Sequence, residues 1–270
     1  MAARLSRVAW LGAFVVLAYA VLSLAAPTIA SYPPDAVFVG DAFEPPSRAF
    51  WLGTDNLGRD VLSRVIYGGR TVLLMAGSAT VISVAIGGGL GMLLGLRRDV
   101  VDQVVMRLID IVMSVPPVIF ALLLIGALGP SAPLIVLVVG VLYVPNVTRV
   151  MRAATLAVAG EDFILAAVAR GESGLAIVLR ELLPNVAGAL VIEFSIRTGF
   201  AAIFISALGF LGFGPPPPSP DWGIMINEGR STMDASLWPV LAPAACLALL
   251  VTSLNLFTDG VARAIDRAAR

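Results

Sequence analysis

The 270-residue sequence contains no lysine and no histidine, and all 18 of its basic residues are arginine. A phosphate-binding P-loop uses a lysine to contact the nucleotide phosphates, so this chain cannot carry a standard ATP site. The absence of histidine excludes a histidine-based catalytic triad and a histidine-ligated metal site. Cys246 is the only cysteine, which excludes an internal disulfide and a multi-cysteine metal site. We therefore expect no catalytic residue, cofactor or metal in this chain, and we expect that it is not an enzyme.

Charge is also scarce. Charged residues make up 13% of the chain and hydrophobic residues 59%, whereas soluble domains are about half apolar and about a quarter charged. The formal net charge is zero, which argues against a nucleic-acid partner. This composition is typical of a protein that lies within a lipid bilayer.

Long uncharged segments recur along the chain, and about 20 apolar residues suffice to cross a bilayer. Because lipid offers no hydrogen-bond partner to the backbone, we predict that every span is helical and that the fold is all-α. A signal peptide is the alternative for the first segment, but its apolar stretch exceeds the usual length of about 7–15 residues. The six predicted spans cover about 8–30, 71–96, a stretch from before Asp110 to the break at 129–133, a stretch from that break to 148, 185–213 and 237–258.

The placement of arginine predicts the orientation, because cytoplasmic loops are enriched in basic residues. More arginines flank the side that holds both chain ends and the loop at 149–184, so we expect these parts in the cytoplasm. We divide the chain into residues 1–70 (first span, external segment and interfacial helix), 71–258 (the transmembrane core with the loop at 160–184) and 259–270 (a cytoplasmic tail).

Two outer segments have distinctive patterns. In the first, one helical face of the stretch that follows Leu57 is apolar, which predicts a short helix on the membrane surface or a lead-in to the second span. In the second, the prolines at 215–218 favour stiff polyproline II geometry, and Trp222 and Trp238 suit the water–lipid interface. This second segment is either a rigid docking wall or a loop that ends the fifth span.

The loop between the fourth and fifth spans predicts two short helices. Glu161 and Asp162 place negative charge at a helix start, Gly171 supplies a turn, Ser173 caps a second helix, and Pro184 ends it. The first helix is almost entirely small or apolar on one face. It is suited to a groove on a soluble partner, or alternatively to the lipid surface.

Two pairs of opposite charge lie within predicted spans. Glu193 and Arg197 are four residues apart, and Arg107 and Asp110 are three apart, so each pair can meet on one helical face. Charges inside a membrane usually face a wet cavity or the bundle interior. Each pair therefore either lines a transport pathway or satisfies itself near the interface.

The chain resembles the dipeptide/oligopeptide/nickel permease family of bacterial ABC importers, in particular its C-type subunit. The run WLGTDNLGRDVLSR at 51–64, preceded by Pro45-Pro46-Ser47, is similar to that subfamily's PPS…WLGTDxxGRDVLSR pattern. The segment at 210–223 is similar to its SFLGxG…PP…WG pattern, with Gly209 in place of serine. In the loop, several residues fall on the family's EAA positions, although Leu165 replaces the glutamate and Ile205 stands where the family often has another one.

The resemblance implies half of a translocation pathway in a bacterial inner membrane, with a coupling helix that contacts an ATPase. The expected partners are a homologous B-type permease, one or two cytoplasmic ABC ATPases that hold ATP and magnesium, an extracytoplasmic solute-binding protein and a peptide. The expected ATPase-coupling residues are Phe163, Ile164, Leu165, Ala166, Ala167, Gly171, Ile177, Leu183 and Pro184. The expected external docking residues are Trp51, Asp55, Arg59, Asp60, Pro216, Pro217, Asp221 and Trp222.

Three functions compete at this point. The first is an ABC permease for short peptides, with nickel, haem or another cargo as alternatives. The second is a secondary transporter or channel that works without a motor, for which polar residues in several spans and internal repeats are expected. The third is an intramembrane enzyme, which would have to use carboxylates because histidine and lysine are missing.

Overall fold

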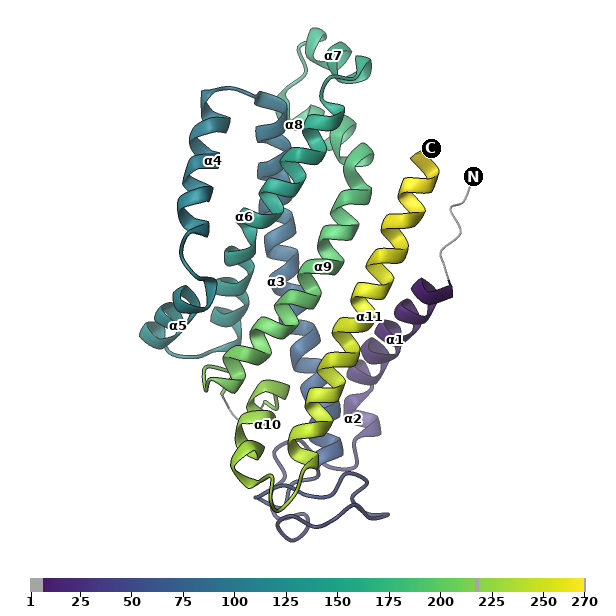
Figure 1. Cartoon of the computed structure of the whole chain (residues 1–270), viewed down its shortest axis with the longest axis vertical. Coiled ribbons are helices and arrows are strands. Elements are labelled where there is room, and N and C mark those ends of the chain that lie inside the picture. Colours follow the sequence, from purple (N-terminus) through teal and green to yellow (C-terminus); the bar gives the residue numbers. More distant parts are fainter. Residues whose placement is uncertain (1–6, 217–218, 270) are drawn as a thin grey trace.

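The computed structural model describes residues 7–216 and 219–269, with side chains as far as residue 264. Within this part of the chain the named elements are all helical, and the only bridge outside them joins Thr54 to Asp60. The helices form an elongated bundle (Figure 1). Their bounds are α1 Arg7–Leu24, α2 Ala26–Ile29, α3 Val61–Arg97, α4 Val100–Met113, α5 Pro117–Leu128, α6 Ala132–Val158, α7 Asp162–Ala169, α8 Gly174–Ile177, the π-helical turn η1 Val178–Leu182, α9 Leu183–Phe210, α10 Trp222–Gly229, the 3₁₀ turn η2 Arg230–Thr232 and α11 Trp238–Ala269.

The all-α, multi-span fold is confirmed. Five helical stretches are long and apolar enough to cross a membrane, beginning at Arg7, Val61, Ala132, Gly174 and Trp238. The predicted third span is different, because α4 and α5 are bent by 78° relative to each other and count as a sixth span only when they are taken together. Pro116 and Pro117 cause the break, since proline lacks an N–H and disfavours helical backbone in the residue before it.

Of the two alternatives for the stretch that follows Leu57, the structure shows the lead-in to the second span. Residues 61–70 are the first turns of α3, which runs unbroken for 37 residues. The Asp60 side chain caps this helix by accepting a hydrogen bond from the Ser63 N–H (2.9 Å). No proline follows until Pro116, so nothing ends the helix between the outer segment and the membrane.

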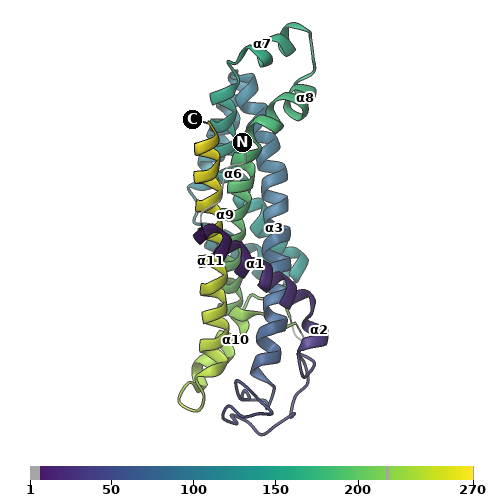
Figure 2. The same ribbon diagram turned by 90° about the vertical axis from the view of Figure 1, so that its right-hand side faces the viewer.

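The centre of the bundle is the contact between α3 and α6. A Cβ atom at Gly87 would lie 2.7 Å from the carbonyl oxygen of Val144, and one at Gly91 would lie 2.6 Å from that of Thr148. Glycine at these two positions therefore lets α6 approach α3 closely. Helix α9 packs on the same pair, and α1 crosses α11 at the edge of the bundle (Figure 2).

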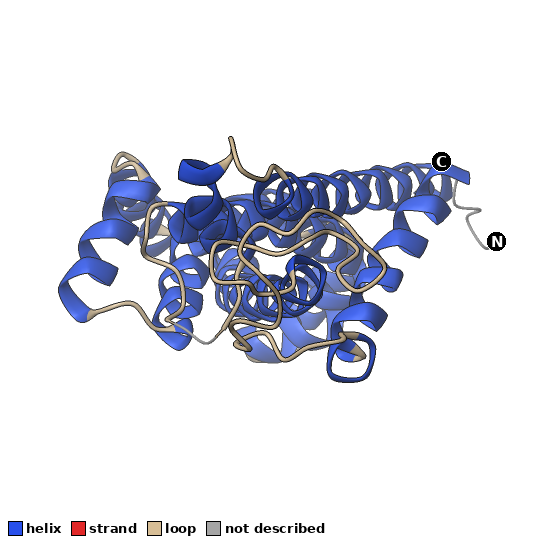
Figure 3. Ribbon diagram, turned by 90° about the horizontal axis from the view of Figure 1, so that it is seen from below, coloured by secondary structure: helices blue, strands red, loops and turns tan. Residues whose placement is uncertain are grey.

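The two ends of the bundle differ. Helix α7 lies at one end, and α11 runs toward that end (Figures 1 and 2). The loop at 30–60 lies at the opposite end, where α10 also lies (Figure 1), and seen from below it folds across the bundle (Figure 3). The segments predicted to lie on opposite sides of the membrane are thus separated along the long axis, and the long helices α3, α6 and α9 run along this axis (Figure 1).

Candidate functional site

The first candidate site is the α7–α8 segment, residues 159–182, at the end of the bundle. Glu161 precedes α7 in extended backbone, and Asp162 occupies its first turn. The predicted glycine turn is present, because Gly171 has a φ of +73°. The Ser173 hydroxyl then accepts a hydrogen bond from the N–H of Ala176 (3.3 Å) and caps α8. The helix–turn–helix predicted from the sequence is confirmed in these parts.

Three residues of the expected coupling set point into the protein. Ile164, Ala167 and Ile177 are at most 2% exposed, and they belong to a core cluster with Met92 of α3 and Met151 of α6. Their expected direct contact with a partner is therefore corrected, because these side chains anchor the segment to the spans. Burial of a side chain the size of isoleucine contributes about 1.5–3 kcal/mol.

The other face of the segment forms what we call the apolar tip. Its side chains are exposed, and their exposed fractions run from 37% for Phe163 to 61% for Leu175. Of the other expected coupling residues, Ala166, Gly171 and Pro184 are exposed and Leu183 is half-buried. The members of the apolar tip are Phe163, Leu165, Val168, Leu175 and Leu179.

Three members of the apolar tip were missed as site residues. The available signal was spacing, since Leu175 and Leu179 are four residues apart, and Val168 follows Leu165 by three. The family pattern drew attention to the small residues between them instead.

Pro184 does not end the second helix, contrary to the prediction. The chain passes through the π-helical turn η1 into α9 without leaving helical conformation. In this turn the Leu183 N–H donates to the carbonyl oxygen of Val178, five residues back. The side-chain amide of Asn185 donates to the main-chain carbonyl oxygen of Glu181 (2.6 Å). Because the turn is wider, the helix continues although Pro184 has no N–H to donate. Helices α8 and α9 are therefore continuous.

Arginines of α6 hold α4 near the same end. Arg152 donates two hydrogen bonds to the Asp102 carboxylate, at 2.5 and 2.6 Å, and Arg149 pairs with Asp110. The predicted Arg107–Asp110 pair is only marginal, because its atoms are 4.0 Å apart and the Arg107 side chain is 85% exposed. Asp110 faces α6, so its main partner comes from tertiary packing and not from its own helix.

The Glu193–Arg197 pair forms within α9, with Nε of Arg197 2.6 Å from Oε1 of Glu193. Both side chains are largely buried. The Arg197 guanidinium also lies over the Tyr143 ring, 5.7 Å from its centroid, and over the Phe200 ring at 5.8 Å. Each charge is thus compensated inside the bundle, and the two alternatives for the role of this pair stay predictions.

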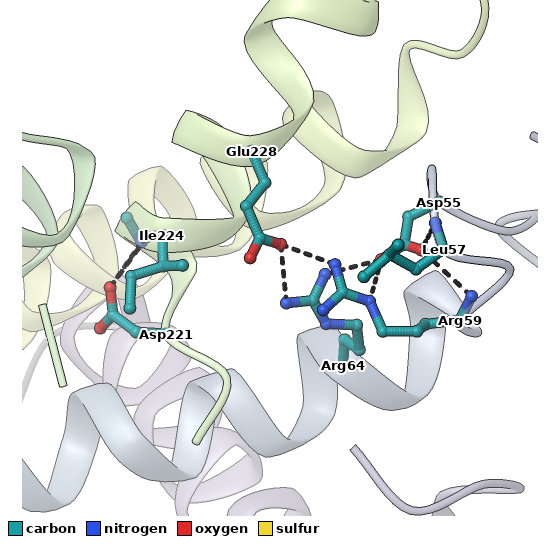
Figure 4. A network of polar contacts seen from close by, with 8 residues as sticks. Asp55, Leu57, Arg59, Arg64, Asp221, Ile224 and Glu228 are labelled. Atoms are coloured by element: carbon teal, nitrogen blue, oxygen red, sulfur yellow. Dashed lines mark hydrogen bonds and ion pairs between the residues drawn. The ribbon is translucent and has the colours of Figure 1, made fainter. Parts of the chain in front are cut away.

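The second candidate site lies at the end of the bundle that is predicted to face outward, and we call it the outer cap. It joins the loop at 54–60, the start of α3 and α10. Oδ2 of Asp55 accepts hydrogen bonds from Nε of Arg59 (2.6 Å) and from Nη1 of Arg64 (2.7 Å). Oε2 of Glu228 on α10 lies 2.8 Å from Nη2 of Arg59 and 3.0 Å from Nη2 of Arg64 (Figure 4). Two arginines are therefore held between a buried carboxylate and a partly exposed one.

Asp221 and Trp222 fasten α10 from its other end. One Asp221 oxygen accepts the main-chain N–H groups of Gly223 (2.8 Å) and Ile224 (3.2 Å; Figure 4). Burial raises the pKa of the Asp221 carboxyl to about 6, against the lowering effect of these two hydrogen bonds. Trp222 is 1% exposed and packs against Gly68 and Gly69 of α3.

The expected external docking set is therefore only partly at the surface. Trp51 is 72% exposed and Pro216 is exposed, whereas Pro217 lies outside the described residues. The remaining five were expected to face a partner, and this is corrected. Asp55, Asp60, Asp221 and Trp222 are buried and Arg59 is mostly buried, because their hydrogen bonds and packing build the cap itself. The same correction applies to Trp222 at the water–lipid interface.

Metal binding has no candidate among the described residues, since no group of three or more His, Cys, Asp or Glu side chains there could hold an ion. The bundle instead has a buried-in segment with an exposed apolar face at one end and a cap held by ion pairs at the other.

Comparison with known proteins identifies one family and several similar transport permeases. Residues 87–270 match the family described as "Binding-protein-dependent transport system inner membrane component". The chain is 33% identical over 267 residues to a dipeptide transport system permease protein of Haemophilus influenzae, covering 97% of this chain and 90% of that protein.

Two further relatives carry related names. A di/tripeptide transport system permease protein of Pseudomonas aeruginosa is 34% identical over 250 residues, covering 90% of this chain and 82% of that protein. A probable D,D-dipeptide transport system permease protein of Escherichia coli is 32% identical over 258 residues, covering 94% and 85% respectively.

Proposed function

The chain belongs to the family of binding-protein-dependent transport system inner membrane components, and we propose that it is a permease subunit of an ATP-driven importer of short peptides. The relatives that match most of its length are permeases of dipeptide or di/tripeptide systems. In this proposal the chain forms half of the pathway and a homologous permease forms the other half. The motor-independent transporter and the intramembrane enzyme are not favoured by any feature of the site.

The observation that carries the proposal is the construction of the α7–α8 segment. Its inner face is buried against α3 and α6, and its second helix continues through η1 into the fifth span. Its outer face exposes the apolar tip where a simple connector would be polar. A separate ATPase that grips this tip would move α6 and α9 together with it, because the segment has little freedom of its own.

The remaining partners follow from this role. ATP and magnesium bind to the ATPase subunits, and a solute-binding protein delivers peptide to the end that carries the outer cap. The α7–α8 segment and the end of α11 then lie on the cytoplasmic side, as does the N-terminus. Alternating access requires two arrangements of the bundle, biased by nucleotide and by peptide.

The test uses the complete complex, purified through a tag on this chain. We expect the double variant Leu165→Asp/Leu175→Asp to reduce the co-purifying ATPase at least tenfold. The two leucines are 54% and 61% exposed, and their replacement removes apolar contacts with the groove of the ATPase. A loss of about 1.4 kcal/mol in binding free energy corresponds to tenfold. The control is Val100→Asp, which is 71% exposed near the same end but outside the apolar tip. Unchanged ATPase recovery with the double variant would overturn the proposal.

A further inference from the structure

A cavity of about 330 Å³ lies between α1, α3 and α11, toward the outer cap. Helices of three different spans form its walls, and the Trp222 ring closes it on the side of α10. It is separate from the apolar tip and shares only Trp222 and Gly69 with the residues described for the outer cap. The lining residues that matter here are Val15, Ala18, Leu22, Ile66, Trp222 and Leu249.

The shape of the cavity follows from where α1 touches its neighbours. Near its start α1 lies directly on α11, because a Cβ at Gly12 would be 2.6 Å from the carbonyl oxygen of Ser253. Near its end α1 reaches α3, where a Cβ at Gly69 would be 3.7 Å from Oγ of Ser23. Between these two contacts α1 bridges a gap, and the cavity is that gap.

The lining is almost wholly apolar. The two large polar side chains in it are satisfied by the protein, since the Tyr19 hydroxyl donates to the carbonyl oxygen of Cys246 (3.1 Å) and the Trp222 indole donates to that of Val65 (2.9 Å). A buried water needs two to four polar partners, so this cavity does not suit water.

The cavity lies at the level of hydrocarbon. Its α11 wall, Cys246 and Leu249, stands about 12–17 Å along the helix from Trp238 at the outer end. Half of a hydrocarbon core is about 15 Å thick. Leu22 and Leu249 at its rim are 45% and 51% exposed, so the opening faces away from the bundle, toward the lipid that surrounds an inner-membrane protein.

We propose that this cavity is a binding site for one acyl chain of a membrane phospholipid from the leaflet on the outer-cap side. An apolar void loses dispersion contacts on every wall, and the bilayer supplies acyl chains at this depth. The chain fills the gap beneath α1 and contacts the Trp222 ring, which holds α10 to α3. The lipid thereby becomes a structural part of the outer cap. This proposal rests on the membrane location alone and is independent of cargo and motor.

The experiment uses the assembled complex in nanodiscs of phosphatidylethanolamine and phosphatidylglycerol, with a small fraction of phospholipid that carries a diazirine on one acyl chain. After photolysis, mass spectrometry maps the adducts. We expect adducts on Trp222, which is 1% exposed and therefore out of reach of lipid that only surrounds the bundle. Adducts on exposed Leu17, at 63%, serve as the internal reference.

Two matched variants test occupancy. Ala18→Phe fills the cavity, and we expect it to lower the Trp222 adducts at least fivefold relative to the Leu17 reference. The control is Leu211→Phe, a similar substitution at an exposed position away from the cavity, which leaves the ratio unchanged. Val15→Phe replaces Ala18→Phe if the latter does not assemble.

The wild-type map decides the matter even without variants. Adducts confined to exposed positions such as Leu17 would overturn the proposal. So would Trp222 adducts that persist unchanged in both cavity-filling variants. Trp222 adducts found with this chain alone but absent from the complex would assign the cavity to a helix of the second permease instead, and would equally overturn it.

Discussion

The indole N–H of Trp222 donates a hydrogen bond to the main-chain carbonyl oxygen of Val65, 157 residues earlier in the chain (2.9 Å). The ring reaches this position because two neighbouring residues of α3 lack side chains. A Cβ at Gly68 would lie 2.8 Å from Cδ1 of the ring, and one at Gly69 would lie 3.0 Å from its Cζ2. The contact joins the segment between the last two long spans to the beginning of α3.

Replacement of Trp222 should destabilise the outer cap. We expect Trp222→Phe to lower the free energy of unfolding by about 1 kcal/mol through the lost hydrogen bond, and Trp222→Ala by about 3–5 kcal/mol through the added cavity. Unfolding of the purified complex by heat, followed by size-exclusion chromatography, measures both. Trp51→Phe is the control, because Trp51 is 72% exposed and its replacement should have little effect.

The paired arginines of the cap give a second prediction. Arg64→Met leaves the buried Asp55 with Arg59 as its only arginine, and removal of one partner from a buried ion pair costs about 3–5 kcal/mol. We expect faster proteolysis of the loop at 31–60 and a lower unfolding temperature. Arg107→Met should be within about 0.5 kcal/mol of wild type, since that side chain is 85% exposed. Equal effects of the two substitutions would contradict the role assigned to the cap network.

Asp221 predicts a specific dependence on pH. Its folded pKa, about 6, lies above the ordinary 3.8 because of burial, so the folded state binds the proton more tightly than the unfolded state. The protonated carboxyl contributes about 3 kcal/mol at most to the free energy of unfolding. This contribution is complete below about pH 4 and is lost as the pH rises through 6. Asp221→Asn retains an acceptor for the two main-chain N–H groups and cannot ionise. The difference in unfolding temperature between wild type and variant should therefore change between pH 4.5 and 7, and a constant difference would refute this assignment.

The close approach of α3 and α6 can be tested by substituting two glycines of α3, one at the contact and one away from it. Gly91→Ala places a Cβ 2.6 Å from the Thr148 carbonyl oxygen, a main-chain atom that cannot rotate away, so the helices must separate. We expect a loss of stability of about 1–3 kcal/mol. Gly77→Ala, on the same helix, meets nothing within 4 Å and should be neutral or stabilising by up to about 1 kcal/mol. Thermal unfolding of both variants in the same detergent gives the comparison.

Ile164 tests the anchoring of the α7–α8 segment, given the proposed function. Ile164→Ala opens space beneath α7 while the apolar tip keeps its side chains. We expect the ATPase still to co-purify and to hydrolyse ATP, while peptide uptake per ATP in proteoliposomes falls severalfold. Val150→Ala, 40% exposed on α6, is the control. Uptake and hydrolysis falling in proportion would indicate lost assembly instead of lost coupling.

Prediction from the sequence succeeded where the physical cause is local. Uncharged runs of membrane-spanning length, the turn at Gly171 and the cap at Ser173 depend on residues close together in the chain. Prediction failed at Pro184, because whether a proline ends a helix depends on whether the preceding turn can widen, as it does in η1. It failed for the external docking set, because charged and aromatic residues were expected to face water.

By itself, the sequence determined that the protein is helical with several runs long enough to span a membrane, since composition and the length of the apolar runs do not depend on packing. It could not determine which face of each short helix is buried. That was decided when α3, α6 and α10 came together. Ile164 and Trp222 became anchors because residues distant in the sequence pack around them, and Leu175 is exposed because none of the described residues covers it.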